Sequence, residues 1–324
     1  MKKRVLSGIR ASGRLHVGNY LGAVKGMLDL QANPEYETLY MVADAHTLTT
    51  PYNIEELRKN RREVIIDYLA AGLDPEKSII FQQSSVNEHF ELAFYFSSVT
   101  TIAKMQHLPT FKDKVKQHPD HTTMALLNYP VLMSADILVY KASSVPVGLD
   151  QEPHLEVARE IARRMNQDYG TDFPEPVRFV TQGEYVPSLT GEGKMGKSVE
   201  GSYINLHDDL DTIRKKVRSI PTATHAGGEM SPGVKALFKL AQLFMGEKSL
   251  SYESAFEQGI LQFVDLKDSL AKAIYTELQP IQEKRKELEN NSTYVDKVIT
   301  EGAEKARAIA RKTVTEVKEK MGLS

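Results

Sequence analysis

The fold is indicated most clearly by residues 4–19, which read Arg4-Val5-Leu6-Ser7-Gly8-Ile9-Arg10-Ala11-Ser12-Gly13-Arg14-Leu15-His16-Val17-Gly18-Asn19. The first four of these residues are typical of a buried strand. A turn carrying Gly8, Ser12 and Gly13 follows, and a helix is expected from about Gly18 to Gln31. The N-terminus of that helix would present unpaired N–H groups to a phosphate, although a glycine-rich turn with a histidine is also often a plain tight connection.

The first two thirds of the chain continue to alternate short apolar runs with helical patterns. Continuous apolar strands separated by helices are typical of a parallel sheet covered on both faces, which binds ligands at the carboxyl ends of its strands. Further strands are expected at 38–43, 78–81, 145–147 and 178–180. Helices are expected from a cap at Asn53 to Leu69 and at 152–166. Much of 86–140 is also expected to be helical, with breaks at 108–109 and 112–116.

From about Leu210 onward the sequence predicts helices alone. The last of them places Ala303, Ala306, Ala310, Val314, Val317 and Met321 on one face. We therefore predict a doubly wound parallel α/β domain over residues 1–195, with a helical insertion at about 85–125. A mobile lysine loop and a helical domain are predicted to follow over residues 196–324.

Composition narrows the class of protein. The 324 residues carry 41 basic and 43 acidic side chains, a net charge of −2, so any contact with nucleic acid must be local. The absence of cysteine excludes disulfides, thiolate metal sites and cysteine nucleophiles. The basic start Met1–Arg4 is not followed by the apolar segment of a secretory signal, and no apolar run approaches the roughly 20 residues of a membrane span. A cytoplasmic protein without membrane contact is expected.

A second motif, Gly193-Lys194-Met195-Gly196-Lys197-Ser198, lies beyond the last predicted strand. Two lysines separated by two residues can close over a polyphosphate and neutralise charge on a leaving group. A bare Lys-x-x-Lys sequence is usually a solvated loop. The prediction of a nucleotide site therefore depends on both motifs occurring together, at opposite ends of one α/β unit.

His16-Val17-Gly18-Asn19 and Lys194–Ser198 resemble the "HIGH" and "KMSKS" motifs of class I aminoacyl-tRNA synthetases, and the whole chain resembles the bacterial tryptophanyl-tRNA synthetase family. The resemblance implies a Rossmann-type catalytic domain, a tRNA-side helical domain and a homodimer. It also implies activation of L-tryptophan with ATP and Mg²⁺, followed by transfer to tRNA(Trp). The stretches that carry it are 7–9, 18–23, 44–46, 133–138, 145–148, 150–151 and 301–303.

The resemblance implies three groups of site residues. It assigns catalysis to His16, Asn19, Lys194, Lys197 and Ser198. It assigns ATP binding to Arg10, Ala11, Ser12, Gly18, Asn19, Gly148, Leu149, Asp150, Val186, Lys194, Met195, Gly196, Lys197 and Ser198, with Mg²⁺ held through the phosphates and by no protein ligand. It assigns tryptophan binding to Leu6, Gly8, His46, Met133, Asp136, Val145, Val147 and Gln151.

Asp136 also stands out from the residues alone, because it lies three positions after Met133 on a mostly apolar helix. Burying an unpaired carboxylate costs several kcal/mol, so Asp136 needs a donor. By itself the sequence allows a hydrated helix edge or a pair with Lys141. The resemblance supplies the indole N–H of tryptophan, with Met133 against the ring. For His46 and Gln151 a purely structural role is also possible. His46 could be a histidine whose hydrogen bonds are made within the protein, and Gln151 could be a helix N-terminal residue that binds no ligand.

The chain departs from the family pattern at three places. Leu149 stands where an acidic residue is usual, which puts a polar contact to ribose or ammonium in doubt. Gly196 replaces the usual serine, and Arg10-Ala11 replaces Gln-Pro and adds a positive charge near the expected phosphates. The departures leave every residue assigned to catalysis in place.

The sequence is compatible with parts of three other functions. A tyrosyl-tRNA synthetase could also use a carboxylate, as the acceptor for the phenol of tyrosine. The sequences of residues 133–136 and 145–150 argue against that enzyme. A smaller nucleotidyltransferase has no use for the helices after 210, and a non-catalytic paralogue need not keep both motifs. Basic side chains that could contact tRNA, or else form a solvated face, are Lys112, Lys114, Lys116, Lys305, Arg307, Arg311 and Lys312.

Overall fold

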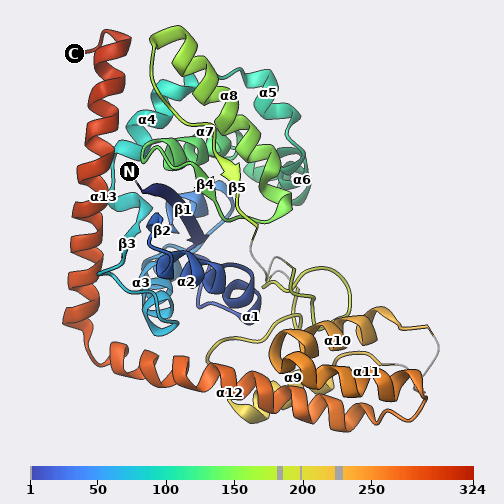
Figure 1. The fold of residues 1–324 in the computed structure, drawn as a ribbon. Coiled ribbons are helices and arrows are strands. Elements are labelled where there is room, and N and C mark those ends of the chain that lie inside the picture. The colour runs from blue at the N-terminus through green and yellow to red at the C-terminus, as the bar shows by residue number, and fades with distance from the viewer. Residues whose placement is uncertain (1, 181–184, 198, 223–228) are drawn as a thin grey trace.

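The computed structural model describes residues 2–180, 185–197, 199–222 and 229–324 (Figure 1). Its centre is a parallel five-stranded sheet in the order β3-β2-β1-β4-β5. The order changes direction between β1 and β4, which is where open α/β sheets bind ligands. The doubly wound α/β prediction is confirmed. The strands are β1 Lys3–Arg10, β2 Tyr36–Ala43, β3 Ser78–Gln82, β4 Ser144–Val145 and β5 Val177–Arg178.

Strand boundaries differ from the prediction in two instructive ways. β1 pairs with β2 as far as Arg10, so Gly8 lies within the strand and the prediction of a turn there is wrong. A Cβ at Gly8 would lie 3.1 Å from the carbonyl oxygen of Met41, so close packing rather than a turn accounts for the glycine. β4 ends at Val145 because Pro146 has no N–H to continue the ladder.

Helices cover both faces of the sheet. The predicted helix from Gly18 begins one residue earlier and contains a π-helical turn at Tyr20–Val24. The predicted break at 112–116 is wrong, because Pro109 starts a helix that includes this charged stretch. The predicted cap is confirmed, since the Asn53 side chain accepts from Glu56 N. The helices of this half are α1 Val17–Asn19, α2 Lys25–Ala32, α3 Ile54–Ala70, α4 Glu88–Ser97, α5 Ile102–His107, α6 Pro109–Gln117, α7 Met124–Leu138 and α8 Glu152–Tyr169.

The described residues after Leu210 are helical, as predicted. Their core is continuous with the α/β unit: one apolar cluster joins Val17 and Ile65 with Ile213, Leu237 and Leu270. The division at residue 195 therefore stays a prediction. The helices are α9 Leu210–Arg218, α10 Pro232–Met245, α11 Ser249–Glu257, α12 Phe263–Glu289 and α13 Ser292–Met321. None of the described helices combines the length and apolar character needed to span a membrane.

The last helix, α13, runs beside the sheet at β3 (Figure 1). Its predicted apolar face is buried from Ala303 to Val317. A Cβ at Gly302 would lie 1.8 Å from the carbonyl oxygen of Ile80, so only glycine allows this approach. Arg307 donates to the Ser85 carbonyl, and Arg311 pairs with Glu88 at 3.0 Å, so both arginines contact the protein itself.

Candidate active site

A cavity of about 380 Å³ opens at the carboxyl ends of β1, β2 and β4, against α7. It lies at the switch point of the sheet, where a ligand site is expected. Apolar and polar side chains line the cavity in about equal numbers, which suits a small molecule that has both an apolar body and charged groups. Every residue predicted to contact tryptophan lines it: Leu6, Gly8, His46, Met133, Asp136, Val145, Val147 and Gln151.

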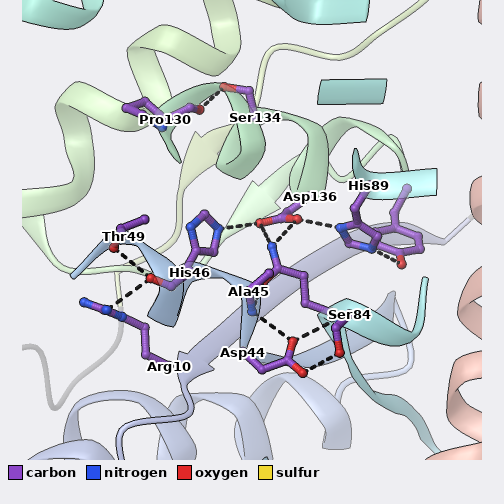
Figure 2. Close-up of polar contacts among 12 residues, drawn as sticks. Arg10, Asp44, Ala45, His46, Thr49, Ser84, His89, Pro130, Ser134 and Asp136 are labelled. Carbon is purple, nitrogen blue, oxygen red and sulfur yellow. Dashed lines mark hydrogen bonds and ion pairs between the residues drawn. The ribbon is translucent and has the colours of Figure 1, made fainter. Parts of the chain in front are cut away.

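The Asp136 carboxylate is buried at one side of this cavity (Figure 2). His46 Nε2 lies 2.8 Å from its Oδ2, and His89 Nδ1 lies 2.5 Å from its Oδ1. Gln83 Nε2 donates to both oxygens, at 2.8 and 2.9 Å. Burial alone would raise the pKa of Asp136, but the hydrogen bonds from His46 and His89 lower that pKa to about 2.

The two structural alternatives for Asp136 are wrong. Its exposed fraction is only 2%, so it is not a hydrated residue at a helix edge. Lys141 is paired with Asp172 and Glu316, the latter at 2.8 Å, and lies in those ion pairs rather than with Asp136. The carboxylate is instead held by side chains from three other segments of the chain.

Two of these side chains, Gln83 and His89, were missed in the sequence. Gln83 follows β3 directly, so the rule that polar groups gather at strand ends could have found it. His89 lies on α4 and carried no such signal. Because a carboxylate only accepts, His89 Nδ1 must be the donor, and His89 Nε2 then accepts from the Tyr140 hydroxyl at 2.7 Å.

His46 lies on a short 3₁₀ turn, Ala45–Thr49, directly after β2. The Asp44 side chain fixes the start of that turn, accepting from Ala45 N at 3.0 Å and from the Ser84 hydroxyl at 2.6 Å (Figure 2). The His46 carbonyl oxygen accepts from Arg10 Nη2 at 3.1 Å. His46 therefore lines the cavity and contacts Asp136, from a loop that also binds the predicted ATP-side residue Arg10.

Gln151 closes another side of the cavity, at the turn Leu149–Gln151 that leads into α8. Its Nε2 donates to Asp150 Oδ2 at 2.7 Å, while its Oε1 lies 3.0 Å from His154 Nδ1. The Tyr129 hydroxyl lies 2.7 Å from His154 Nε2. Gln151 is thus both a residue at the start of a helix and part of a polar chain beside the cavity.

His16 is buried at the start of α1, and Asn19 Oδ1 accepts from its backbone N–H at 3.2 Å. Burial, followed by the charges of Lys197 and Lys194, lowers the pKa of His16 to about 4, so the ring is neutral at neutral pH. Its Nδ1 is buried and has no hydrogen-bond partner among the described residues. A buried, unpaired nitrogen beside two lysines fits a polyphosphate that would supply the missing partner.

Gly18 gives His16 its position. A Cβ at residue 18 would lie 2.8 Å from His16 Cε1 and 3.2 Å from Met195 Cβ. Glycine at this position is therefore explained by packing alone, because a side chain would collide with the His16 ring and with the lysine segment. The expected approach of adenine to this backbone stays a prediction.

The two sequence motifs converge in space. Lys197 Nζ donates to the Ser12 carbonyl oxygen at 3.1 Å, and Lys194 Nζ lies 3.7 Å from the place of a Cβ on Gly148. The Val186 carbonyl oxygen accepts from Met195 N at 2.9 Å, which anchors the lysine segment. The ATP-side residues Ser12, Gly18, Gly148 and Val186 thus lie beside or within bonding distance of this assembly. Arg10 instead lines the cavity and binds the His46 carbonyl oxygen, and Ser198 lies outside the described residues.

Within the described ranges, His, Asp and Glu side chains form no group of three that could hold a metal ion. The polar side chains that act on His16 itself, those of Asn19, Lys194 and Lys197, carry no negative charge. A divalent cation would therefore need oxygens other than those of these side chains, and phosphate oxygens are the usual source.

Comparison with known proteins agrees with this geometry. Residues 1–279 match the family model described as "tRNA synthetases class I (W and Y)". The tryptophan–tRNA ligase of Porphyromonas gingivalis is 39% identical, with 98% of each chain covered.

Solved structures give the same result. The Campylobacter jejuni tryptophanyl-tRNA synthetase, crystallised with ADP and tryptophan, is 32% identical with a TM-score of 0.86, covering 99% of this chain and 100% of that one. The Mycoplasma pneumoniae tryptophanyl-tRNA synthetase is 30% identical with a TM-score of 0.88, covering 100% and 99%. The chain therefore belongs to the tryptophan–tRNA ligase family of class I aminoacyl-tRNA synthetases.

Proposed function

We propose that the chain activates L-tryptophan with ATP, forming tryptophanyl-adenylate and pyrophosphate, and then transfers the tryptophanyl group to the 3′ end of tRNA(Trp). The observation that carries the proposal is the convergence of His16 and Lys197, from the two motifs, near a cavity that holds an ionised, buried Asp136. A binding protein without chemistry would not need the leaving-group cations.

In the proposed complex, tryptophan lies in the cavity with its indole N–H toward Asp136 and with Met133 against the ring. The Asp136 oxygens already accept four hydrogen-bond contacts, so an indole donor must replace one of them. His46 is the donor most open to the cavity, with a side chain 12% exposed, whereas that of His89 is 0% exposed. We therefore assign the exchange to His46.

The reacting groups meet at the junction of the two sites. A tryptophan carboxylate oxygen attacks the α-phosphorus of ATP, a P–O bond forms, and the bond to pyrophosphate breaks. The protein needs no nucleophile for this step, so its contribution is positioning and charge stabilisation. His16 and Asn19 would donate to phosphate oxygens, and Lys194 and Lys197 would stabilise the pyrophosphate. Mg²⁺ bound together with ATP would neutralise part of the phosphate charge.

Gln151 and Asp150 would receive the substrate ammonium or the ribose. The Gln151 amide oxygen is oriented by His154, and Asp150 supplies a carboxylate next to it. Leu149 carries no polar side chain, so this carboxylate would bear the role alone.

The remaining partners are a second copy of the chain and tRNA in the cytoplasm. Exposed apolar side chains support a homodimer: Phe90 and Phe94 on α4 are 39% and 76% exposed, and Ile102 on α5 is 63% exposed. Phe90 and Phe94 lie four residues apart on one face of α4, and exposed apolar side chains that are grouped in this way mark interaction surfaces. We assign them to the dimer contact.

The test is amino-acid-dependent ATP–pyrophosphate exchange with each of the twenty amino acids. Exchange with tryptophan alone, and no competition from excess tyrosine, is the expected result. Exchange that depends on tyrosine or on no amino acid would overturn the proposal.

A further inference from the structure

The backbone around His16 is held from both sides by other segments. Leu15 N donates to Asp67 Oδ2 at 2.7 Å, and the Leu15 carbonyl oxygen accepts from Leu206 N at 3.1 Å. Val17 N donates to the Ile204 carbonyl oxygen at 2.8 Å. The position of His16 is therefore set by Asp67 on α3 and by residues 204–206, in addition to its own short helix.

Both of these supports are bonded to α12. The Arg285 guanidinium, 6% exposed, pairs with Asp67 Oδ1 and with Glu63 Oε2. Gln282 Nε2 donates to the carbonyl oxygens of Leu206 at 2.8 Å and Asp208 at 2.9 Å. Residues 282 and 285 are three apart, so they project from one face of the helix.

The contacts favour a fixed geometry. A guanidinium is planar and presents its donors in a rigid fork, so Arg285 holds two carboxylates in one orientation. Glu63 Oε2 also accepts from Arg14 Nε at 2.7 Å, which brings another residue of the His16 loop into the same group. Movement of α12 would shift Asp67 and the 204–208 segment together, and with them both sides of the His16 backbone.

We propose that Gln282 and Arg285 are positioning residues for adenylate formation: they hold the 15–17 backbone, and thereby His16, where ATP requires it. The inference rests on the proposed function. It also makes α12 the element through which a displacement of the C-terminal helices would reach the ATP side. The tryptophan cavity shares none of these contacts, since neither Gln282 nor Arg285, nor the side chains they bind, line it.

Catalysis is sensitive to such positioning, because a misplacement of about 1 Å can cost about 100-fold in rate. Loss of one α12 contact should therefore lower kcat while leaving the KM for tryptophan nearly unchanged. A purely structural role would lower the amount of folded enzyme and leave the kcat of the folded fraction intact.

The first variant is Gln282→Met, which removes two neutral hydrogen bonds and leaves no buried charge behind. Its matched control is Lys267→Met. Lys267 also lies on α12 and also donates to two backbone carbonyls, those of Arg218 at the end of α9 at 3.0 Å and of Ile220 at 2.7 Å. None of its hydrogen bonds to described residues reaches the His16 loop. Thermal unfolding midpoints of both variants report the stability that each contact provides.

The second variant is the double change Asp67→Asn with Arg285→Met. An asparagine oxygen can still accept from Leu15 N, whereas the link from Asp67 to α12 is cut. Arg285 also pairs with Glu63 and Glu289, and both of these carboxylates keep Arg14 as a partner in the double variant. Kinetics are measured by tryptophan-dependent pyrophosphate exchange on the full chain, with kcat normalised to active sites titrated by the single-turnover burst.

We expect kcat to fall at least ~10-fold in Gln282→Met and in the double variant, with the KM for tryptophan within ~2-fold of the parent, and kcat to be retained in Lys267→Met. A kcat within ~2-fold of the parent in Gln282→Met, or an equal loss in Lys267→Met, overturns the inference. If the double variant does not fold, Gln282→Met decides alone. A parent chain without tryptophan-dependent exchange would instead contradict the proposed function, which keeps the two failures distinct.

Discussion

The two halves of the candidate site are built in opposite ways. On the tryptophan side, Asp136 is buried and each of its oxygens accepts from two donors in the free protein. On the ATP side, His16 has a buried nitrogen without a partner among the described residues, and the hydrogen bond that Lys197 makes within those residues goes to a backbone carbonyl. The first half is complete before substrate arrives, and the second has polar groups that a ligand would complete.

This difference suits two different tasks. Selecting one amino acid requires a fixed acceptor, because a substrate that displaces the His46 donor without supplying an N–H leaves the acceptor short of one hydrogen bond. Stabilising a leaving pyrophosphate requires cations that meet charge as it develops. Changes on the tryptophan side should therefore act on binding and selectivity, and changes on the ATP side on the rate.

The largest effect should come from Lys197→Ala on the ATP side. Removing one charge-stabilising donor typically costs ~2.7–4 kcal/mol of transition-state stabilisation, or ~100–1,000-fold in rate. Single-turnover adenylate formation should fall by that amount, while equilibrium dialysis shows unchanged tryptophan affinity. Lost tryptophan binding with normal turnover would mean that the two halves are not separate.

The next effect is a pH dependence of stability from His16. Its pKa is about 4 in the folded protein and ~6.5 in the unfolded chain, so the unfolded chain binds the proton first. The contribution of His16 to the free energy of unfolding is complete above about pH 6.5. It is lost as the pH falls to about 4, which lowers the free energy of unfolding by roughly 3 kcal/mol.

Urea unfolding of the parent and of His16→Asn at pH 7, 5.5 and 4 measures this contribution. The free energy of unfolding should fall more steeply in the parent, and the difference isolates residue 16. Asp136 stabilises the fold in a separate pH range. Because its pKa is about 2 in the folded protein, its contribution to the free energy of unfolding is lost between about pH 4 and pH 2. Equal slopes for the two proteins between pH 7 and 4 would contradict the assignment for His16.

A somewhat smaller effect is expected from Asp136→Asn on the tryptophan side. A hydrogen bond to a charged group contributes ~1.5–3 kcal/mol, so tryptophan should bind ~10–100-fold more weakly. The KM for ATP should stay within ~2-fold. A benzothiophene analogue of tryptophan, which lacks the N–H, should bind the variant and the parent equally well, and a matching loss for both ligands would show that Asp136 does not contact the indole nitrogen.

The smallest effect should come from Gly18→Ala. The added methyl group meets the His16 ring and Met195, and overpacking of this kind costs ~1–3 kcal/mol. We expect a loss of ~10-fold in kcat with tryptophan affinity unchanged. A crystal structure of the variant with an undisplaced His16 ring and full activity would show that the space beside Gly18 does not matter.

Sequence reasoning reached those parts of the site that follow local rules. Residues in the segments that follow parallel strands, such as His46 after β2 and Gln151 after β4, could be placed because strand ends meet at one edge of a sheet. The face shared by Met133 and Asp136 followed from helical spacing. The lysine motif was paired with the His16 turn because both motifs occur in one α/β unit and because the family resemblance links them, since no local rule relates positions so far apart.

The rest depended on packing that no short pattern encodes. His89 reaches Asp136 because α4 packs on α7, and Arg285 reaches Asp67 across the interface of α12 with α3. The glycine at position 8 was misread as a turn, because glycine serves both turns and close contacts and the sequence does not distinguish them.

The contact between Gly302 and Ile80 has a consequence for how the chain is made. β3 is the edge strand of the sheet, and α13, at the end of the chain, lies against it. During synthesis the strand edge is complete long before its cover has left the ribosome, and an uncovered edge is a template for pairing with another chain. Loss of residues 292–324 should therefore send the nascent protein into aggregates, even though the whole sheet and both nucleotide motifs would be present.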